Sequence, residues 1–299
     1  MRRVDIRKAI RGAGKALISV GILLFLFVGY QLWGTGIAEA RGQRDLEKRF
    51  QQRQLLTSVP TIPNPTGGPV TTTTVPPIDL GDSVAMIEIP KIDVKKFVIE
   101  GVDVEDLKAG PGHYPGTPLP GEKGNAAIAG HRTTYGAPFY DLNELSAGDQ
   151  IFVTTAAGRF EYDVSETLIV DPEEGVWVLD NTPDDRLTLT TCHPRFSAAQ
   201  RMIVVAKLIT PAVEAAPRAE PASTLTTPRV AVGGGLSGEA VSKTPVILWG
   251  AFAATLWAAG WVFGRKWRRW PAYAITAVPF LVVLFVFYEN VARLLPANV

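Results

Sequence analysis

The chain has 299 residues, a formal net charge of +1 and 46% hydrophobic residues. This near-neutral balance excludes a protein whose main partner is nucleic acid, because such a protein needs a strongly basic surface. The hydrophobic share suits one or two ordinary domains together with apolar membrane segments.

Three long segments are nearly free of charged residues, and each is close to the ~20 residues that cross a bilayer. They cover residues 16–33, 245–263 and 272–290. None shows the polar face of a buried core helix, so we interpret them as transmembrane helices. The first segment is longer than the ~7–15 apolar residues of a signal peptide, which favours an uncleaved anchor.

Basic residues cluster in two places beside these segments, over residues 1–15 and 264–271. The positive-inside rule predicts that both clusters are cytoplasmic. Residues 34–244 and the tail, residues 291–299, then lie outside the cell. The expected location is the cell membrane, crossed three times, with membrane lipid as a partner and the folded part on the extracellular face.

The extracellular part begins with a stalk and a linker over residues 34–80. Residues 37–56 are rich in Glu, Gln, Arg and Lys, which is typical of a short solvated helix. Residues 58–77 are rich in Pro and Thr and hold too few apolar side chains to fold, so they predict an extended linker. A second linker, rich in Ala, Pro and Gly, covers residues 211–244.

Residues 81–210 are enough for one folded domain with a core. Helix is expected only over residues 104–108, with a turn around residues 139–145. Many short strands at close spacing predict a mostly β fold, a closed or nearly closed barrel with few short helices. The expected strands cover residues 84–89, 95–99, 126–129, 150–155, 159–170, 186–191 and 201–208.

The single cysteine, Cys192, follows the strand predicted over residues 186–191. A lone thiol outside the cell cannot form an intramolecular disulfide and is a liability unless it does chemistry. We therefore predict that Cys192 is a nucleophile. Because a thiol with a pKa of ~8.5 is mostly protonated at neutral pH, it needs a base or a positive neighbour.

Of the three histidines, His131 is the best candidate for that base. It follows the strand predicted over residues 126–129, at the kind of strand end where catalytic groups are common. His193 is adjacent to Cys192, and adjacent strand residues point to opposite faces. His113 lies in a loop rich in Gly and Pro and would line a groove.

Acyl transfer by a thiol also needs a donor for the developing oxyanion, and arginine is a strong one. Arg201 opens the strand that follows Cys192, so it lies beside the thiol if the two strands pair. Arg195 and Arg132 are the alternatives. The acidic residues show no spacing typical of a metal site, so we expect no metal and no other cofactor.

These residues together resemble the sortase family, and most of all the class E sortases of high-GC Gram-positive (actinobacterial) bacteria. The resemblance extends over residues 84–208. It is carried by Thr188-Leu189-Thr190-Thr191-Cys192, by Arg201, by Gly130-His131-Arg132, and by the wider strings over residues 112–117 and 129–136.

The resemblance implies a sortase-like closed β-barrel and a membrane-anchored cysteine transpeptidase. Such an enzyme cleaves a C-terminal sorting signal, of the Leu-Ala-x-Thr-Gly or Leu-Pro-x-Thr-Gly type, between Thr and Gly. It then attaches the protein to an amine of a cell-wall precursor. The implied partners are secreted proteins that carry a sorting signal and the lipid-linked peptidoglycan precursor.

Roles for individual residues follow from the same resemblance. Cys192 would be the nucleophile, His131 the general acid and base, and Arg201 the group that steadies the substrate or the oxyanion. Substrate contacts would come from Tyr114, Thr190 and Thr191, and Tyr114 would favour the Leu-Ala type of signal.

Two other interpretations stay open. A thioester-forming endopeptidase would end the reaction with water instead of an amine, and a catalytically silent barrel on a stalk would act as a scaffold. The combination of Cys192, His131 and Arg201 argues against the scaffold. The two C-terminal apolar segments depart from the family, whose members commonly have one N-terminal span, and suit a second anchor or a partner-binding role.

Overall fold

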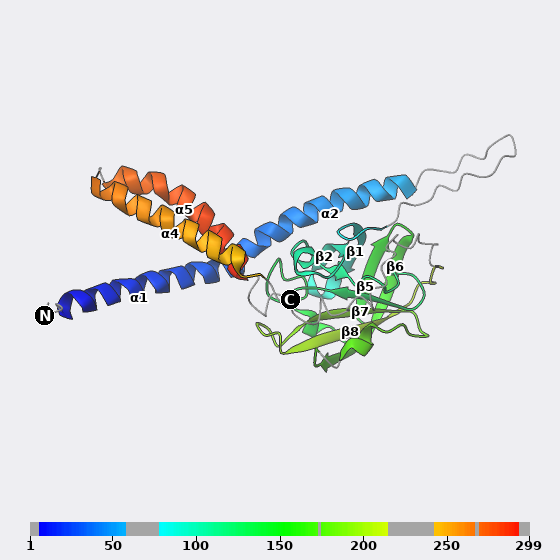
Figure 1. Cartoon of the computed structure of the whole chain (residues 1–299). Helices are drawn as coiled ribbons and strands as arrows, with labels where there is room; N and C mark the ends of the chain where they lie inside the picture. The colour runs from blue at the N-terminus through cyan, green and yellow to red at the C-terminus, as the bar shows by residue number, and fades with distance from the viewer. Residues whose placement is uncertain (1–5, 58–77, 173–174, 215–241, 267–268, 293–299) are drawn as a thin grey trace, which may run out of the picture. The chain divides into compact units, whose positions relative to one another are not determined.

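The computed structural model describes residues 6–57, 78–172, 175–214, 242–266 and 269–292 (Figure 1). The chain divides into two compact units. One consists of residues 1–35 and 240–295, and the other is built mainly from residues 36–239.

The first unit contains three helices that are long and apolar enough to cross a membrane. The hydroxyl of Tyr288 donates a hydrogen bond to the carbonyl of Leu23 at 2.8 Å, which joins the last helix to the first. A π-helical segment, Tyr30–Gly34, follows the first helix. The three helices are α1 (Ile6–Gly29), α4 (Thr244–Lys266) and α5 (Arg269–Ala292).

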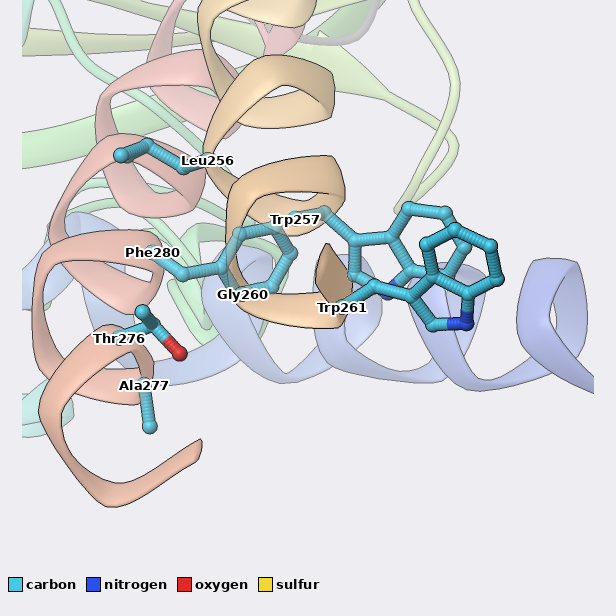
Figure 2. A pocket seen from close by; sticks show the side chains of 7 residues that line it. All are labelled: Leu256, Trp257, Gly260, Trp261, Thr276, Ala277 and Phe280. Carbon is cyan, nitrogen blue, oxygen red and sulfur yellow. The ribbon is translucent and has the colours of Figure 1, made fainter. Parts of the chain in front are cut away.

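A cavity of ≈290 Å³ lies between α4 and α5 (Figure 2). The two helices come close at Gly260, where a Cβ would lie 2.9 Å from Oγ1 of Thr276. Apart from the Thr276 hydroxyl and the indole N–H groups of Trp257 and Trp261, the lining side chains are apolar, so this cavity offers no acid, base or thiol for chemistry. It is lined by Leu256, Trp257, Gly260, Trp261, Thr276, Ala277 and Phe280.

In the second unit, within the part of the chain that the structure describes, eight strands close into a barrel, which confirms the predicted fold. Their order around it is β1-β2-β3-β4-β7-β8-β6-β5. The pairs β2/β3 and β4/β7 are parallel and the other neighbours are antiparallel. The strands are β1 (Ser83–Ile89), β2 (Val94–Glu100), β3 (Gly112–His113), β4 (Asn125–Ala129), β5 (Gln150–Thr155), β6 (Gly158–Val170), β7 (Arg186–His193) and β8 (Gln200–Leu208).

Short helical segments occupy the connections between the strands. The helix predicted over residues 104–108 is present as α3, and the turn predicted around residues 139–145 contains a 3-10 turn. The segments are α3 (Val104–Leu107) and the 3-10 turns η2 (Pro90–Ile92), η3 (Leu142–Glu144) and η4 (Gly175–Leu179).

Both faces of β7 and β8 are covered, which is why these strands are buried over almost their whole length. The inward residues of β7, such as Leu187 and Leu189, belong to the main core. The outward residues of β4 and β8 belong to a second apolar cluster outside the barrel, which α3, η4 and Tyr114 cover. That cluster contains Val102, Leu107, Tyr114, Ala127, Ala129, Val178, Leu179, Ile203 and Val205.

Helix α2 (Thr35–Thr57) occupies the segment predicted as a solvated helix, but it is not solvated on every side. Leu46 and Phe50 are buried, and the ring centroid of Phe50 lies 5.6 Å from that of Phe97 on β2. Arg53 forms an ion pair with Asp82 at 2.7 Å. The expectation was wrong because an apolar pair at i and i+4 is enough to dock a helix whose composition is otherwise polar.

Some predicted segments were missed or cannot be compared. The two-residue strand β3 was not predicted, because it is too short for an alternating pattern. The linker predicted over residues 58–77 and most of the one predicted over residues 211–244 lie outside the described residues.

Candidate active site

Cys192, His131 and Arg201 are carried by the ends of three neighbouring strands. Strands β4 and β7 are parallel with Ala129 opposite Thr190, so His131 and Cys192 each lie two residues beyond this pair. Strands β7 and β8 are antiparallel, and Cys192 lies directly opposite Arg201. Opposite residues of an antiparallel pair share one face, with their Cβ atoms about 4.5–5.5 Å apart. The strand pairing that brings Arg201 beside the thiol is therefore present.

The Cys192 side chain lies on the outer face of β7 and is only 6% exposed. Burial raises the pKa of its thiol, while the charges of Arg201 and Arg132 act in the opposite direction. The cavity beside the thiol measures ≈10 Å³, which is room for about one water molecule. It is lined by Leu107, Ala129, Gly130, Thr190, Thr191, Cys192 and Arg201.

The imidazole of His131 is also buried, with 1% of the residue exposed. Burial, helped by the positive charge of Lys108, lowers its pKa to about 4, so the ring is neutral at pH 7. Its Nε2 atom has no hydrogen-bond partner among the described residues. A buried ring nitrogen in this state is able to exchange a proton with a group that enters the site.

Two contacts fix the backbone that carries His131. The hydroxyl of Thr191 donates to the carbonyl of Gly130 at 2.7 Å, and the N–H of Phe139 donates to the carbonyl of His131 at 3.2 Å. Position 130 requires glycine, because a Cβ would lie 2.6 Å from the ring of Phe139. The loop after β4 is thereby held against the end of β7.

Tyr114 is buried beside the same strand end, with its hydroxyl 3.1 Å from Oγ1 of Thr190. Burial raises the pKa of the phenol to about 12, so it is neutral at physiological pH. The hydroxyls of Thr190 and Thr191 both contact other groups of the protein in this closed arrangement. Of these three residues, which were predicted to contact substrate, Thr190 and Thr191 line the cavity beside Cys192, and Tyr114 contacts Thr190.

The ring nitrogens of the other two histidines contact other groups of the protein. His113 is fully buried, with Nδ1 2.7 Å from Glu100 and Nε2 2.9 Å from the carbonyl of Pro118. The expectation that it lines a groove is wrong, because both ring nitrogens are used inside the wall. His193 is half-buried at the end of β7, and its Nδ1 lies 3.5 Å from Nη1 of Arg132.

The side chains of the two alternative arginines make contacts with other groups of the protein. Arg195 pairs with Asp141 at 2.8 Å and stacks over the ring of Tyr140. Arg132 is buried, and its Nη1 donates to the carbonyl of Cys192 at 3.2 Å while its Nη2 donates to Oδ1 of Asn143 at 2.6 Å. Arg132 therefore supports the backbone of Cys192 and adds positive charge near the thiol.

This arrangement predicts the effect of Arg132→Gln. The variant takes the Arg132 donor away from one buried acceptor, the carbonyl of Cys192, so the free energy of unfolding should fall by about 1 kcal/mol. It also removes one of the two cations that lower the thiol pKa, so the midpoint of Cys192 alkylation should move to higher pH. Arg132→Lys keeps the charge without the fork-shaped donor, so its midpoint should stay nearer the native one. An unchanged midpoint in Arg132→Gln would contradict this account.

Two residues that influence the site were missed in the sequence. Leu107 lines the cavity from α3, and Lys108, whose ammonium pairs with Glu105 at 2.8 Å, influences His131. Leu107 ends an ordinary short helix and Lys108 follows it, and no local pattern links this segment to a strand end about eighty residues later in the chain. Only the closed barrel brings them together.

The sequence of this chain is similar to those of several known proteins. Residues 87–209, which include Cys192, His131 and Arg201, match the model of the sortase domain. Sortase SrtE1 of Streptomyces coelicolor is 33% identical over 216 residues, which are 67% of this chain and 57% of that protein. Sortase D of Bacillus subtilis is 35% identical over 136 residues, which are 44% of this chain and 67% of that protein.

The alignment with sortase SrtE1 thus spans little more than half of that protein's length. Among solved structures, the crystal structure of sortase E1 from Streptomyces coelicolor with a tripeptide in the active site has 37% sequence identity and a TM-score of 0.41. The match covers 44% of this chain and 90% of that one.

Proposed function

Because the chain belongs to the sortase family, we propose that it is a membrane-anchored cysteine transpeptidase with Cys192 as its nucleophile. The observation that carries the proposal is the buried Nε2 of His131, which has no hydrogen-bond partner in the described part of the chain and lies at the same end of the paired strands β4 and β7 as the chain's single thiol. Arg201, buried and directly opposite Cys192, supplies the positive charge that a developing oxyanion needs.

The first half-reaction begins from a neutral thiol and a neutral imidazole. His131 accepts the proton of Cys192, and the thiolate attacks the carbonyl carbon of Thr in the sorting signal. Arg201 donates hydrogen bonds to the tetrahedral oxyanion. The intermediate collapses when the Thr-Gly bond breaks, and the imidazolium gives its proton to the departing Gly amine. The signal is then held as a thioester on Cys192.

The second half-reaction reverses these roles. An amine of the acceptor attacks the thioester carbonyl, and neutral His131 takes the proton that this amine loses. The thiolate of Cys192 leaves and regains a proton from the imidazolium, which restores the starting pair. The same histidine thus serves as acid and then as base, as microscopic reversibility requires.

We infer the substrates and the location from the family. The donor is a secreted protein with a Leu-Ala-x-Thr-Gly or Leu-Pro-x-Thr-Gly signal, which would bind beside Tyr114, Thr190 and Thr191. The acceptor is the amine of a lipid-linked peptidoglycan precursor. Three apolar helices and two basic clusters support a chain that crosses the membrane three times with its barrel outside.

The decisive experiment uses the full chain in detergent micelles with each signal peptide. Mass spectrometry should detect a Cys192 thioester of the fragment that ends in Thr, and an added amine should convert it to the amide. Cys192→Ala is the control and should give neither species. Hydrolysis alone in the presence of a good amine would favour the endopeptidase, and no adduct or cleavage with either peptide would overturn the proposal.

A further inference from the structure

Helix α2 is attached to the barrel through Gln43, whose side chain makes three hydrogen bonds to backbone groups. Its Nε2 donates to the carbonyls of Phe97 at 3.0 Å and Ala109 at 2.8 Å, and its Oε1 accepts from the N–H of Phe97 at 2.8 Å. One side chain therefore holds both β2 and the backbone that follows α3.

The α3 loop (residues 101–110) lies between this helix and the thiol. Gly42 of α2 packs so closely on it that a Cβ would lie 2.6 Å from Cα of Ala109. Two residues before Ala109, Leu107 lines the cavity beside Cys192. A movement of α2 away from the barrel would remove the support behind this wall.

The same helix supports the loop that carries His131. Glu39 is buried and pairs with Lys96 at 2.6 Å. Its carboxyl also rests on Gly136, where a Cβ would lie 2.7 Å from Cδ of Glu39. The neighbouring Tyr135 places its ring 5.1 Å from the ring of His131. Helix α2 thus touches loops on both sides of the site.

The site is closed in this arrangement. The cavity of ≈10 Å³ holds about one water molecule, whereas each residue of an extended peptide is about 3.3 Å long before its side chain is counted. Because Cys192 is only 6% exposed, a peptide carbonyl would reach its thiol more readily if part of the wall moved. The α3 loop is suited to such a movement, because it begins and ends at glycines, Gly101 and Gly110, with φ of 121° and 154°.

We propose that Gln43 is a positioning residue that holds the α3 loop closed over Cys192, and that a peptide reaches the thiol when this contact is released. The peptide part of the inference rests on the proposed function, but the closure can be measured on the thiol alone. If closure competes with binding, the apparent affinity for peptide is reduced by the fraction of molecules that are open. The same fraction limits the reaction of Cys192 with a small alkylating reagent.

The test measures alkylation of Cys192 by iodoacetamide in the full chain, where it is the only thiol. Gly42→Ala adds a Cβ that collides with the α3 loop, whereas a Cβ at Gly36, on the same helix, has no atom within 4 Å. Gln43→Ala removes the three hydrogen bonds, and Gln51→Ala changes an exposed glutamine of α2. Circular dichroism verifies that each variant is folded.

We expect Cys192 to react about tenfold faster in Gly42→Ala and Gln43→Ala than in the native chain. The loss of one well-packed contact shifts a local opening equilibrium toward the open form by about this factor. Gly36→Ala and Gln51→Ala should stay within about twofold of the native rate. Equal rates in all five proteins would overturn the proposal, and so would equal acceleration by the control variants.

Peptide kinetics separate this role from general loss of structure. In Gly42→Ala and Gln43→Ala, KM for the signal peptide should fall by the same factor by which alkylation rises, with kcat nearly constant. A lower kcat with unchanged KM would overturn the proposal. If the native chain cleaves no peptide, the proposed function fails, while the alkylation rates still decide whether α2 closes the site.

Discussion

Replacing Cys192 with alanine is expected to reduce transpeptidation by about 10⁴-fold or more, because no other thiol is present to form the acyl intermediate. The free energy of unfolding should change by only about 1 kcal/mol, since the side chain removed is small and sits beside a cavity. The measurement is the rate of amide formation between a signal peptide and an added amine, alongside a thermal melt.

Cys192→Ser is the matched variant, because it keeps the size and shape of the side chain. It should be nearly as inactive, since a hydroxyl needs a strong base and His131, with a pKa of about 4, is a weak one. Cleavage by Cys192→Ala at a rate within tenfold of the native one would assign the chemistry to another group.

The sequence predicted the strands well because successive side chains of a barrel strand alternate between two faces, which gives the sequence a period of two residues. The runs around Leu187 and Val204 alternate between the core and a second apolar face, and the predicted bounds differ from the observed ones by at most two residues. Such a pattern also predicts a partner strand for Cys192, because a turn that returns the chain at once favours antiparallel pairing. The position of Arg201 opposite Cys192 could therefore be predicted from the nearby sequence alone.

The burial of the site was not predictable in the same way. His131 is buried beside the ring of Tyr135 and is influenced by the charge of Lys108, and Tyr114 contacts Thr190 from a loop 76 residues away in sequence. These contacts depend on how the barrel closes, and no single segment encodes them. The sequence therefore predicted which groups would do the chemistry and left their protonation states open.

The docking of α2 was missed for a related reason. Its charged residues outnumber its apolar ones, so the helix looks solvated, while Gln43 makes its contacts to backbone carbonyls that carry no sequence signal. A glutamine that binds backbone resembles, in sequence, any other surface glutamine.

Replacing His131 with glutamine is expected to lower kcat/KM by about 10³-fold, because it removes the group that protonates the leaving amine. Glutamine keeps a polar side chain of similar reach and cannot exchange a proton at neutral pH. Alkylation of Cys192 should change far less, since that reaction needs a thiolate and no acid. The ratio of the two effects therefore distinguishes a lost acid from a damaged thiol.

The pH dependence of the native chain tests the same role. The pKa of His131 is lowered to about 4 and that of Cys192 is raised, so between these values the pair shares one proton. The active form, thiolate with imidazolium, is then a small fraction that does not vary with pH. We expect kcat/KM to be flat from about pH 5 to 8, while alkylation rises up to about tenfold per pH unit toward the thiol pKa. If kcat/KM instead rises in parallel with alkylation, the thiolate acts alone and His131 is not the acid.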